Sequence, residues 1–129
     1  MLLFIDPAQI DKTTIALVND KKIFKKSWLS RFKQSETLLT QIKKFFRAQK
    51  INWKNISKIA VVSGPGPFSR IRTGVAMANA LAFALDIPVI SVNESETDLF
   101  KIQKKSGQKM IKPAYGKSAH ITYSKNLPR

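Results

Sequence analysis

A glycine–proline turn is the segment whose residue types first point to a binding site. Gly64, Pro65 and Gly66 separate an apolar segment from a run of small residues. Where a strand turns into a helix N-terminus, free backbone N–H groups and the helix dipole both favour an anion. A phosphate site is therefore one interpretation. The other is a rigid turn that lets the helix pack closely on the sheet.

The specific phosphate-binding signatures are not met. A Walker A loop requires glycine followed by lysine, beginning five residues after its first glycine. Counted from Gly64, those places hold Ser69 and Arg70. The dinucleotide fingerprint requires a glycine where Ser69 stands. The turn alone therefore does not identify a nucleotide site.

Other chemistries lack the residues they need. A nuclease of the ribonuclease-H type needs several carboxylates around paired metal ions. Asp6 has a plausible position on the first predicted strand, and Asp86 is the only acid in the central segment 59–93. The sequence has no cysteine and one histidine, His120, so neither a zinc site nor a Ser-His-Asp set can be assembled. We expect no catalytic residues, no metal and no cofactor.

Hydrophobic periodicity predicts five strands and three helices. Apolar and β-branched runs indicate strands at 2–6, 12–20, 22–29, 56–64 and 88–92. Apolar residues at three- and four-residue intervals indicate helices at 35–49, 69–85 and 94–107. Ser35 and Ser69 are the candidate N-caps, and Gly107 is the expected stop of the third helix.

The predicted order β-β-β-α-β-α-β-α fits an α/β fold. Three strands joined by short turns extend into two strands reached through helices, which gives a mixed five-stranded sheet with flanking helices. This is the ribonuclease-H-like arrangement that also builds each lobe of actin-like proteins. Residues 1–107 are expected to form this lobe, and 108–129 a basic C-terminal tail.

The charge is strongly positive and unevenly placed. The 129 residues include 23 Lys and Arg against 8 Asp and Glu, a net charge of +15. Such a field favours polyanions, RNA above all, although a solvated lysine-rich surface is equally compatible. Tyr115 and Tyr123 could stack on bases or belong to a tail that binds nothing. The candidate tRNA contacts are Lys101, Lys104, Lys105, Lys109, Lys112 and Lys117.

The compartment is predicted from the first residues and the apolar runs. The opening "MLLFID" has no basic region before its apolar run and reaches an acid at Asp6, which argues against a signal peptide. The longest apolar stretch, 75–85, is shorter than the roughly 20 residues that span a bilayer. We expect a cytoplasmic protein with no membrane partner.

Small residues follow one face of the second predicted helix. Gly74, Ala78 and Ala82 are four residues apart, and Ala76 and Ala80 form a neighbouring row. Small side chains allow another backbone to approach near the short end of the ~8–10 Å range. That backbone could belong to the chain's own first helix or to a helix of a partner.

The glycine–proline segment resembles a known family. "SGPGPFSRIRTGVAMANALAFALDIPVISV" is similar to the "GPGSFTGLRIG" signature of TsaB, also called YeaZ. The segments "LLFIDPAQIDKTTIALVND", "KQSETLLTQIKKFF" and "KPAYGKSAHITYSK" are similar to other parts of that family. The motif residues are Gly64, Pro65, Gly66, Phe68, Arg72 and Gly74.

The sequence departs from the family pattern at several places. Pro7 replaces a threonine after the first strand, and Gln34 replaces a histidine before the first helix. After Gly66, the family's serine, threonine and glycine are here Pro67, Ser69 and Arg70. The chain is also about half the family's usual length, so the second lobe is expected to be missing.

The resemblance implies a role in tRNA modification. TsaB is the non-catalytic partner of TsaD in the synthesis of threonylcarbamoyladenosine next to the anticodon. A TsaD-like catalytic subunit, a TsaE-like ATPase, tRNA within the complex and a second copy of the chain are the implied partners. The candidate partner-binding residues are Leu39, Ile42, Phe46, Gly74, Ala78 and Ala82.

Two alternatives stay open. The chain could be a small basic RNA-binding protein that has lost the TsaD partnership, or a nucleotide-binding actin-like enzyme that uses the glycine–proline turn. We expect no ATPase activity, because one lobe cannot enclose ATP. In addition, Pro7 removes a backbone donor from the turn after the first strand, and Ala8 offers no hydroxyl.

Overall fold

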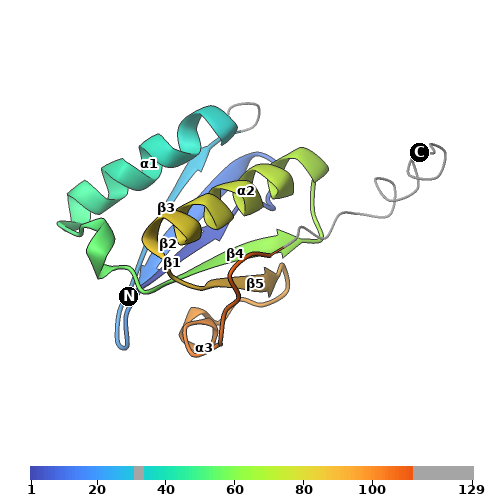
Figure 1. Ribbon diagram of the computed structural model, residues 1–129. Coiled ribbons are helices and arrows are strands. Elements are labelled where there is room, and N and C mark those ends of the chain that lie inside the picture. Colours follow the sequence, from blue (N-terminus) through green and yellow to red (C-terminus); the bar gives the residue numbers. More distant parts are fainter. Residues whose placement is uncertain (31–33, 112–129) are drawn as a thin grey trace.

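The computed structural model describes residues 1–30 and 34–111. Within them, the predicted order of strands and helices is confirmed, with one short 3-10 helix added before the fourth strand (Figure 1). The elements are β1 (Leu2–Asp6), β2 (Lys12–Val18), β3 (Ile23–Leu29), α1 (Gln34–Gln49), η1 (Trp53–Asn55), β4 (Lys58–Gly64), α2 (Phe68–Leu85), β5 (Val89–Asn93) and α3 (Leu99–Ile102).

The strands form one mixed sheet in the order β3-β2-β1-β4-β5. The first three strands pair antiparallel, and β4 and β5 continue from β1 in parallel. Helices α1 and α2 lie side by side on one face of the sheet, and α3 lies on the other (Figure 1). The predicted α/β fold is therefore confirmed, including the helices on both faces.

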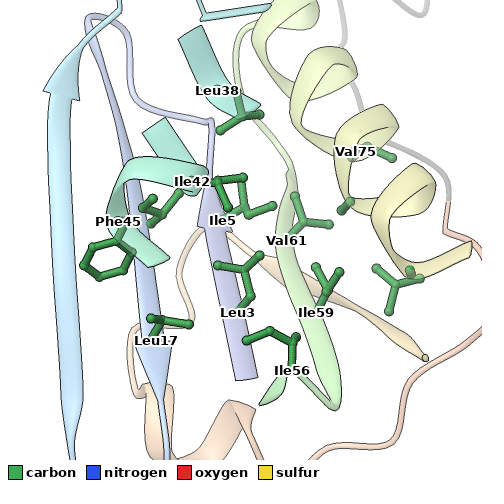
Figure 2. Close-up of a cluster of buried hydrophobic side chains, with 14 of the residues drawn as sticks. Leu3, Ile5, Leu17, Leu38, Ile42, Phe45, Ile56, Ile59, Val61 and Val75 are labelled. Carbon is green, nitrogen blue, oxygen red and sulfur yellow. The ribbon is translucent and has the colours of Figure 1, made fainter. Parts of the chain in front are cut away.

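Alternation along the strands divides the core into two layers. Leu3 and Ile5 of β1 point toward α1 and α2, where they meet Ile42 and Val75 (Figure 2). Phe4, between them in sequence, belongs to the second layer with the residues that contact α3. Side chains on a strand alternate between faces, so the uninterrupted apolar run of β1 is explained by helices on both sides.

Helix α3 is much shorter than the sequence predicts. It begins after Asp98, whose side chain accepts from the backbone N–H groups of Phe100 and Lys101. Before it, Asn93 accepts from the backbone N–H of Ser95 and forms a turn. Local side-chain hydrogen bonds of this kind compete with helix formation, so the acidic residues that resembled a first helical turn lie outside the helix.

The segment after α3 crosses the edge of β5 and reaches α2. Gln108 and Val89 exchange two backbone hydrogen bonds of 2.8 Å. The side chain of Asn79 on α2 then accepts from Ile111 N at 3.0 Å and donates to Ile111 O at 2.9 Å. Ile111 is buried in the layer under α1 and α2. Residues 108–111, which begin the predicted basic tail, thus lie on the lobe.

Candidate functional site around the glycine–proline turn

The glycine–proline turn connects β4 to α2. Gly64 ends the strand with φ at 129°, and the peptide bond between Gly64 and Pro65 is cis. Helix α2 begins at Phe68 with Pro67 at the N-cap, where no side chain accepts a hydrogen bond from the helix. Ser69 lies inside the first turn, so the prediction that it caps this helix is wrong. The glycine–proline turn therefore positions α2 through its backbone conformation rather than through a capping side chain.

Two glycines of the motif allow α2 to contact the turn that follows β1. A Cβ atom on Gly74 would lie 2.4 Å from Cγ and 2.7 Å from Cβ of Pro7. A Cβ atom on Gly66 would lie 3.2 Å from Cβ of Ala8 and 3.0 Å from Cδ1 of Ile71. Carbon atoms do not approach to 2.4 or 2.7 Å, and hence Gly74 is required for the helix to reach Pro7, whereas the contacts at Gly66 are tight and need only a small shift of the neighbouring side chains.

Arg70 extends inward from α2 and holds three chain segments together. Its Nε donates to the carbonyl oxygen of Pro7 at 3.2 Å. Nη1 donates to the carbonyl oxygen of Ser30 at 3.0 Å, and Nη2 to that of Lys12 at 2.8 Å. Nη2 also contacts the hydroxyls of Thr13 and Ser30. The turn after β1, the start of β2 and the end of β3 are thereby fixed to one side chain.

Burial changes the electrostatics of this arginine. Only 6% of Arg70 is exposed, and desolvation lowers the pKa of its guanidinium, partly opposed by the charges of Asp11 and Asp6. An arginine begins with a pKa so high that it stays charged. Buried charges require partners, and here carbonyl and hydroxyl oxygens surround the cation.

Gln34 joins the same network from the start of α1. Its side-chain amide hydrogen-bonds Thr13 Oγ1 at 2.8 Å, and Thr13 in turn contacts the Ser30 hydroxyl at 2.6 Å. Pro7, Gln34 and Arg70 are three of the departures from the family pattern, and the structure brings them together. Sequence reasoning missed this cluster, although Arg70 is one of very few charges in the apolar segment 59–93.

Most of the predicted partner-binding residues lie inside the lobe. Ile42 and Ala78 are fully buried, and Ala82 is 1% exposed. Phe46 and Gly74 are buried as well, and Leu39 is half-buried. The row of small residues thus packs within the chain, because Gly74 contacts Pro7. These five residues therefore belong to the core of the lobe, and a role for them in partner binding stays a prediction.

A second row, with small side chains at Thr73, Ala76 and Ala80 in its middle, lies on the solvent side of α2. We call it the outer face, and its residues are Ser69, Arg72, Thr73, Ala76, Ala80 and Phe83. Arg72 lies over the ring of Phe68, 5.6 Å from its centroid. A shallow hollow of about 300 Å³ is lined by Ser69, Arg72, Thr73 and Ala76. Phe83 is 87% exposed, an unusual position for a phenylalanine.

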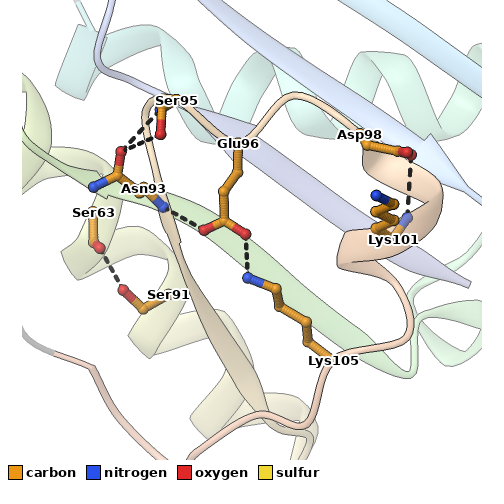
Figure 3. A network of polar contacts seen from close by, with 8 residues as sticks. All are labelled: Ser63, Ser91, Asn93, Ser95, Glu96, Asp98, Lys101 and Lys105. Carbon is orange, nitrogen blue, oxygen red and sulfur yellow. Dashed lines mark hydrogen bonds and ion pairs between the residues drawn. The ribbon is translucent and has the colours of Figure 1, made fainter.

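A polar network holds the loop that follows β5, next to the end of β4 (Figure 3). Ser63 on β4 hydrogen-bonds Ser91 on β5. Glu96 accepts from the backbone N–H of Asn93 at 2.9 Å and pairs with Lys105. The hydrogen bond from Lys105, followed by that from Asn93, lowers the pKa of Glu96. The network orders the loop and occupies one of the predicted RNA-contacting lysines.

The other predicted tRNA contacts have different outcomes. Lys101, Lys104 and Lys109 are exposed, so their ammonium groups are accessible. The remaining candidates lie outside the described residues, as do the histidine and tyrosines of the basic segment: Lys112, Lys117, His120, Tyr115 and Tyr123. RNA binding by Lys101, Lys104 and Lys109 stays a prediction.

In the described part of the chain, two classes of feature are not found. No three His, Asp or Glu side chains approach one another closely enough to hold a metal ion in residues 1–30 and 34–111. No helix in the same residues has the length and apolar character to cross a membrane.

Comparison with known proteins assigns the family. A family model described as TsaD, tRNA N6-adenosine threonylcarbamoyltransferase, matches residues 30–116. A curated relative described as tRNA threonylcarbamoyladenosine biosynthesis protein TsaB, from Buchnera aphidicola of Schizaphis graminum, is 29% identical over 111 residues. The chain belongs to the TsaB/YeaZ family. The resemblance of the glycine–proline segment is thus confirmed.

Further matches show how much of each relative this chain covers. The alignment with the Buchnera TsaB covers 86% of this chain and 52% of that protein. The tRNA N6-adenosine threonylcarbamoyltransferase of Geotalea uraniireducens is 27% identical over 79% of this chain and 35% of its own length. YeaZ from Pseudomonas aeruginosa shares the fold, with a TM-score of 0.67 and 24% identity over 71% of this chain and 43% of that one. The chain spans about half the length of its TsaB relatives.

Proposed function

We propose that this TsaB/YeaZ lobe is a non-catalytic subunit that docks on a TsaD-type protein and supports threonylcarbamoyladenosine synthesis on tRNA. The observation that carries the proposal is the outer face of α2. It combines small side chains along its middle with Phe83, 87% exposed, near its end. Burying a phenylalanine that water otherwise surrounds contributes about 2 kcal/mol to an association.

The outer face has the geometry that a helix–helix contact needs. Ala76 and Ala80 are exposed and one turn apart, so a partner helix can approach along this row at about 8 Å. The opposite row, with Gly74, fixes α2 on the sheet at its contact with Pro7. A rigid helix that presents a narrow side loses little conformational entropy on docking.

The surroundings of the turn after β1 support a role without catalysis. The carbonyl oxygen of Pro7 accepts from Arg70, and Asp6 accepts from Ala8 N at 3.0 Å and from Gln9 at 3.1 Å. These polar groups are thus used within the lobe.

Co-purification tests the docking proposal. A tagged chain should retain the TsaD-type protein of the same organism, and Ala76→Trp should reduce the retained amount about tenfold or more, because a bulky ring prevents close helix approach. The matched control is Ser106→Trp, at another exposed position, after α3. Retention that is unchanged in the Ala76 variant, or lost equally in both, would refute docking through the outer face.

The molecular mass and activity of the purified material test the remaining parts. Size-exclusion chromatography with light scattering distinguishes a complex with TsaD from a second copy of the chain and from a further TsaE-type subunit. The isolated chain should neither hydrolyse ATP above a buffer control nor form threonylcarbamoyladenosine on tRNA alone. Either activity in the purified chain would contradict the non-catalytic role.

A further inference from the structure

One end of the lobe collects basic residues from segments far apart in sequence. Strands β1, β4 and β5 run parallel, so all three begin at this end, and the hairpin between β2 and β3 turns there, because Val18 pairs with Leu2 (Figure 1). Helix α1 ends there as well, next to η1. We call this end the basic pole, and its residues are Lys21, Lys22, Arg47, Lys50, Lys54, Lys58 and Lys104.

The acidic residues are concentrated at the opposite end. Asp20, in the hairpin, and Asp86, after α2, are the acids that share the end where β1, β4 and β5 begin. The others lie where the parallel strands end and the helices begin: Asp6, Asp11, Glu36, Glu94, Glu96 and Asp98. Most of the acids thus lie at the end opposite the basic pole, and they share that end with Lys12, Arg70 and Arg72.

The basic pole is built on fixed backbone. Lys58 Nζ donates to the carbonyl oxygens of Gln103 at 2.8 Å and Lys105 at 3.0 Å, which attaches the end of α3 to the start of β4. The side chain of Asn19 accepts from the backbone N–H groups of Lys21 and Lys22 and holds the hairpin turn. A hollow of about 340 Å³ joins these parts, and it is lined by Met1, Leu2, Asn19, Asp20, Ser57, Lys58, Gln103 and Lys104.

Ordinary structural roles explain only part of this charge. A basic residue in the last turn of a helix complements the helix dipole, which accounts for Arg47. Lysines on an edge strand prevent sheet-to-sheet pairing, which accounts for Lys25 and Lys26 on β3, outside the basic pole. Neither reason applies to Lys21 and Lys22 in the hairpin turn.

We propose that the basic pole binds the phosphodiester backbone of RNA. Clustered ammonium groups on a rigid surface gain free energy when phosphates release their counterions, and the hollow lets a backbone lie between the hairpin and the end of α3. The basic pole differs from the candidate tRNA contacts after residue 100, since only Lys104 is common to both. The proposed function enters only in the choice of tRNA as the probe.

Anisotropy titration of a fluorescent, unmodified tRNA transcript tests this proposal with the full chain alone. One variant carries Lys21→Gln, Lys22→Gln and Lys54→Gln. A control variant carries Lys25→Gln, Lys26→Gln and Lys43→Gln, which removes the same charge from exposed or half-buried sites of β3 and α1. Urea denaturation of all three proteins establishes that each is folded.

The basic-pole variant should bind tRNA about tenfold or more weakly than the wild type, and the control much less so. Its slope of log K against log salt should be shallower by about 2, since each lost phosphate contact removes about 0.7–0.9. Equal losses in both variants would mean that only the overall field matters and would overturn the proposal, as would no loss in the basic-pole variant. No TsaD-type protein is present, so this result stands apart from the docking experiment.

Discussion

Replacing Gly74 with alanine tests the central contact of the fold. The added Cβ would lie 2.4 Å from Cγ of Pro7, about 1 Å closer than carbon atoms tolerate. Pro7 is buried, and its ring cannot rotate away. Overpacking of this kind costs up to about 3 kcal/mol, whereas alanine in a helix is about 1 kcal/mol better than glycine. We therefore expect Gly74→Ala to destabilise the lobe by about 2 kcal/mol.

Urea denaturation followed by circular dichroism measures this change in the free energy of unfolding. A double-mutant cycle with Pro7→Gly isolates the contact, because removing the ring removes the clash. In that background, Gly74→Ala should be neutral or stabilising. If Gly74→Ala stabilises the wild-type lobe by about 1 kcal/mol, helix propensity alone decides, and the proposed reason for the glycine is incorrect.

Two further predictions concern polar groups. Arg70→Met should destabilise the lobe by about 2–4 kcal/mol, since it leaves buried carbonyl oxygens without donors. The control, Arg72→Met, is at an exposed site of the same helix and should change stability by less than about 0.5 kcal/mol. Equal effects of the two variants in urea denaturation would contradict the buried network. The pKa of Glu96 is lowered by Lys105, so the stabilisation that this pair provides is present above the unfolded-state pKa of about 4.3 and is lost as the pH falls through the folded-state value. Both side chains are partly exposed, so Glu96→Gln should remove less than about 1 kcal/mol at pH 6 and nothing at pH 2. A variant equally weakened at both pH values would show that charge is not the cause.

Much of the fold was predictable because strands and helices are local patterns. The apolar runs of β1 and β4 and the helical spacing in α1 each indicate one structure, and their order limits the sheet to few topologies. The glycine–proline block was also visible as a motif. The predicted extent of α3 was wrong because Asn93 and Asp98 hydrogen-bond the nearby backbone, a competition that periodicity does not detect.

The sequence by itself determined the order of the elements and the presence of a helix with two rows of small residues. It did not determine which row faces the sheet, because the rows of Ala78 and Ala76 are almost equally small. That choice depends on Pro7, a residue distant in sequence whose ring fits only against a glycine. The same rotation of α2 buries Arg70 and exposes Arg72, since residues two apart on a helix point in nearly opposite directions. Tertiary packing thus decided which surface is free for a partner.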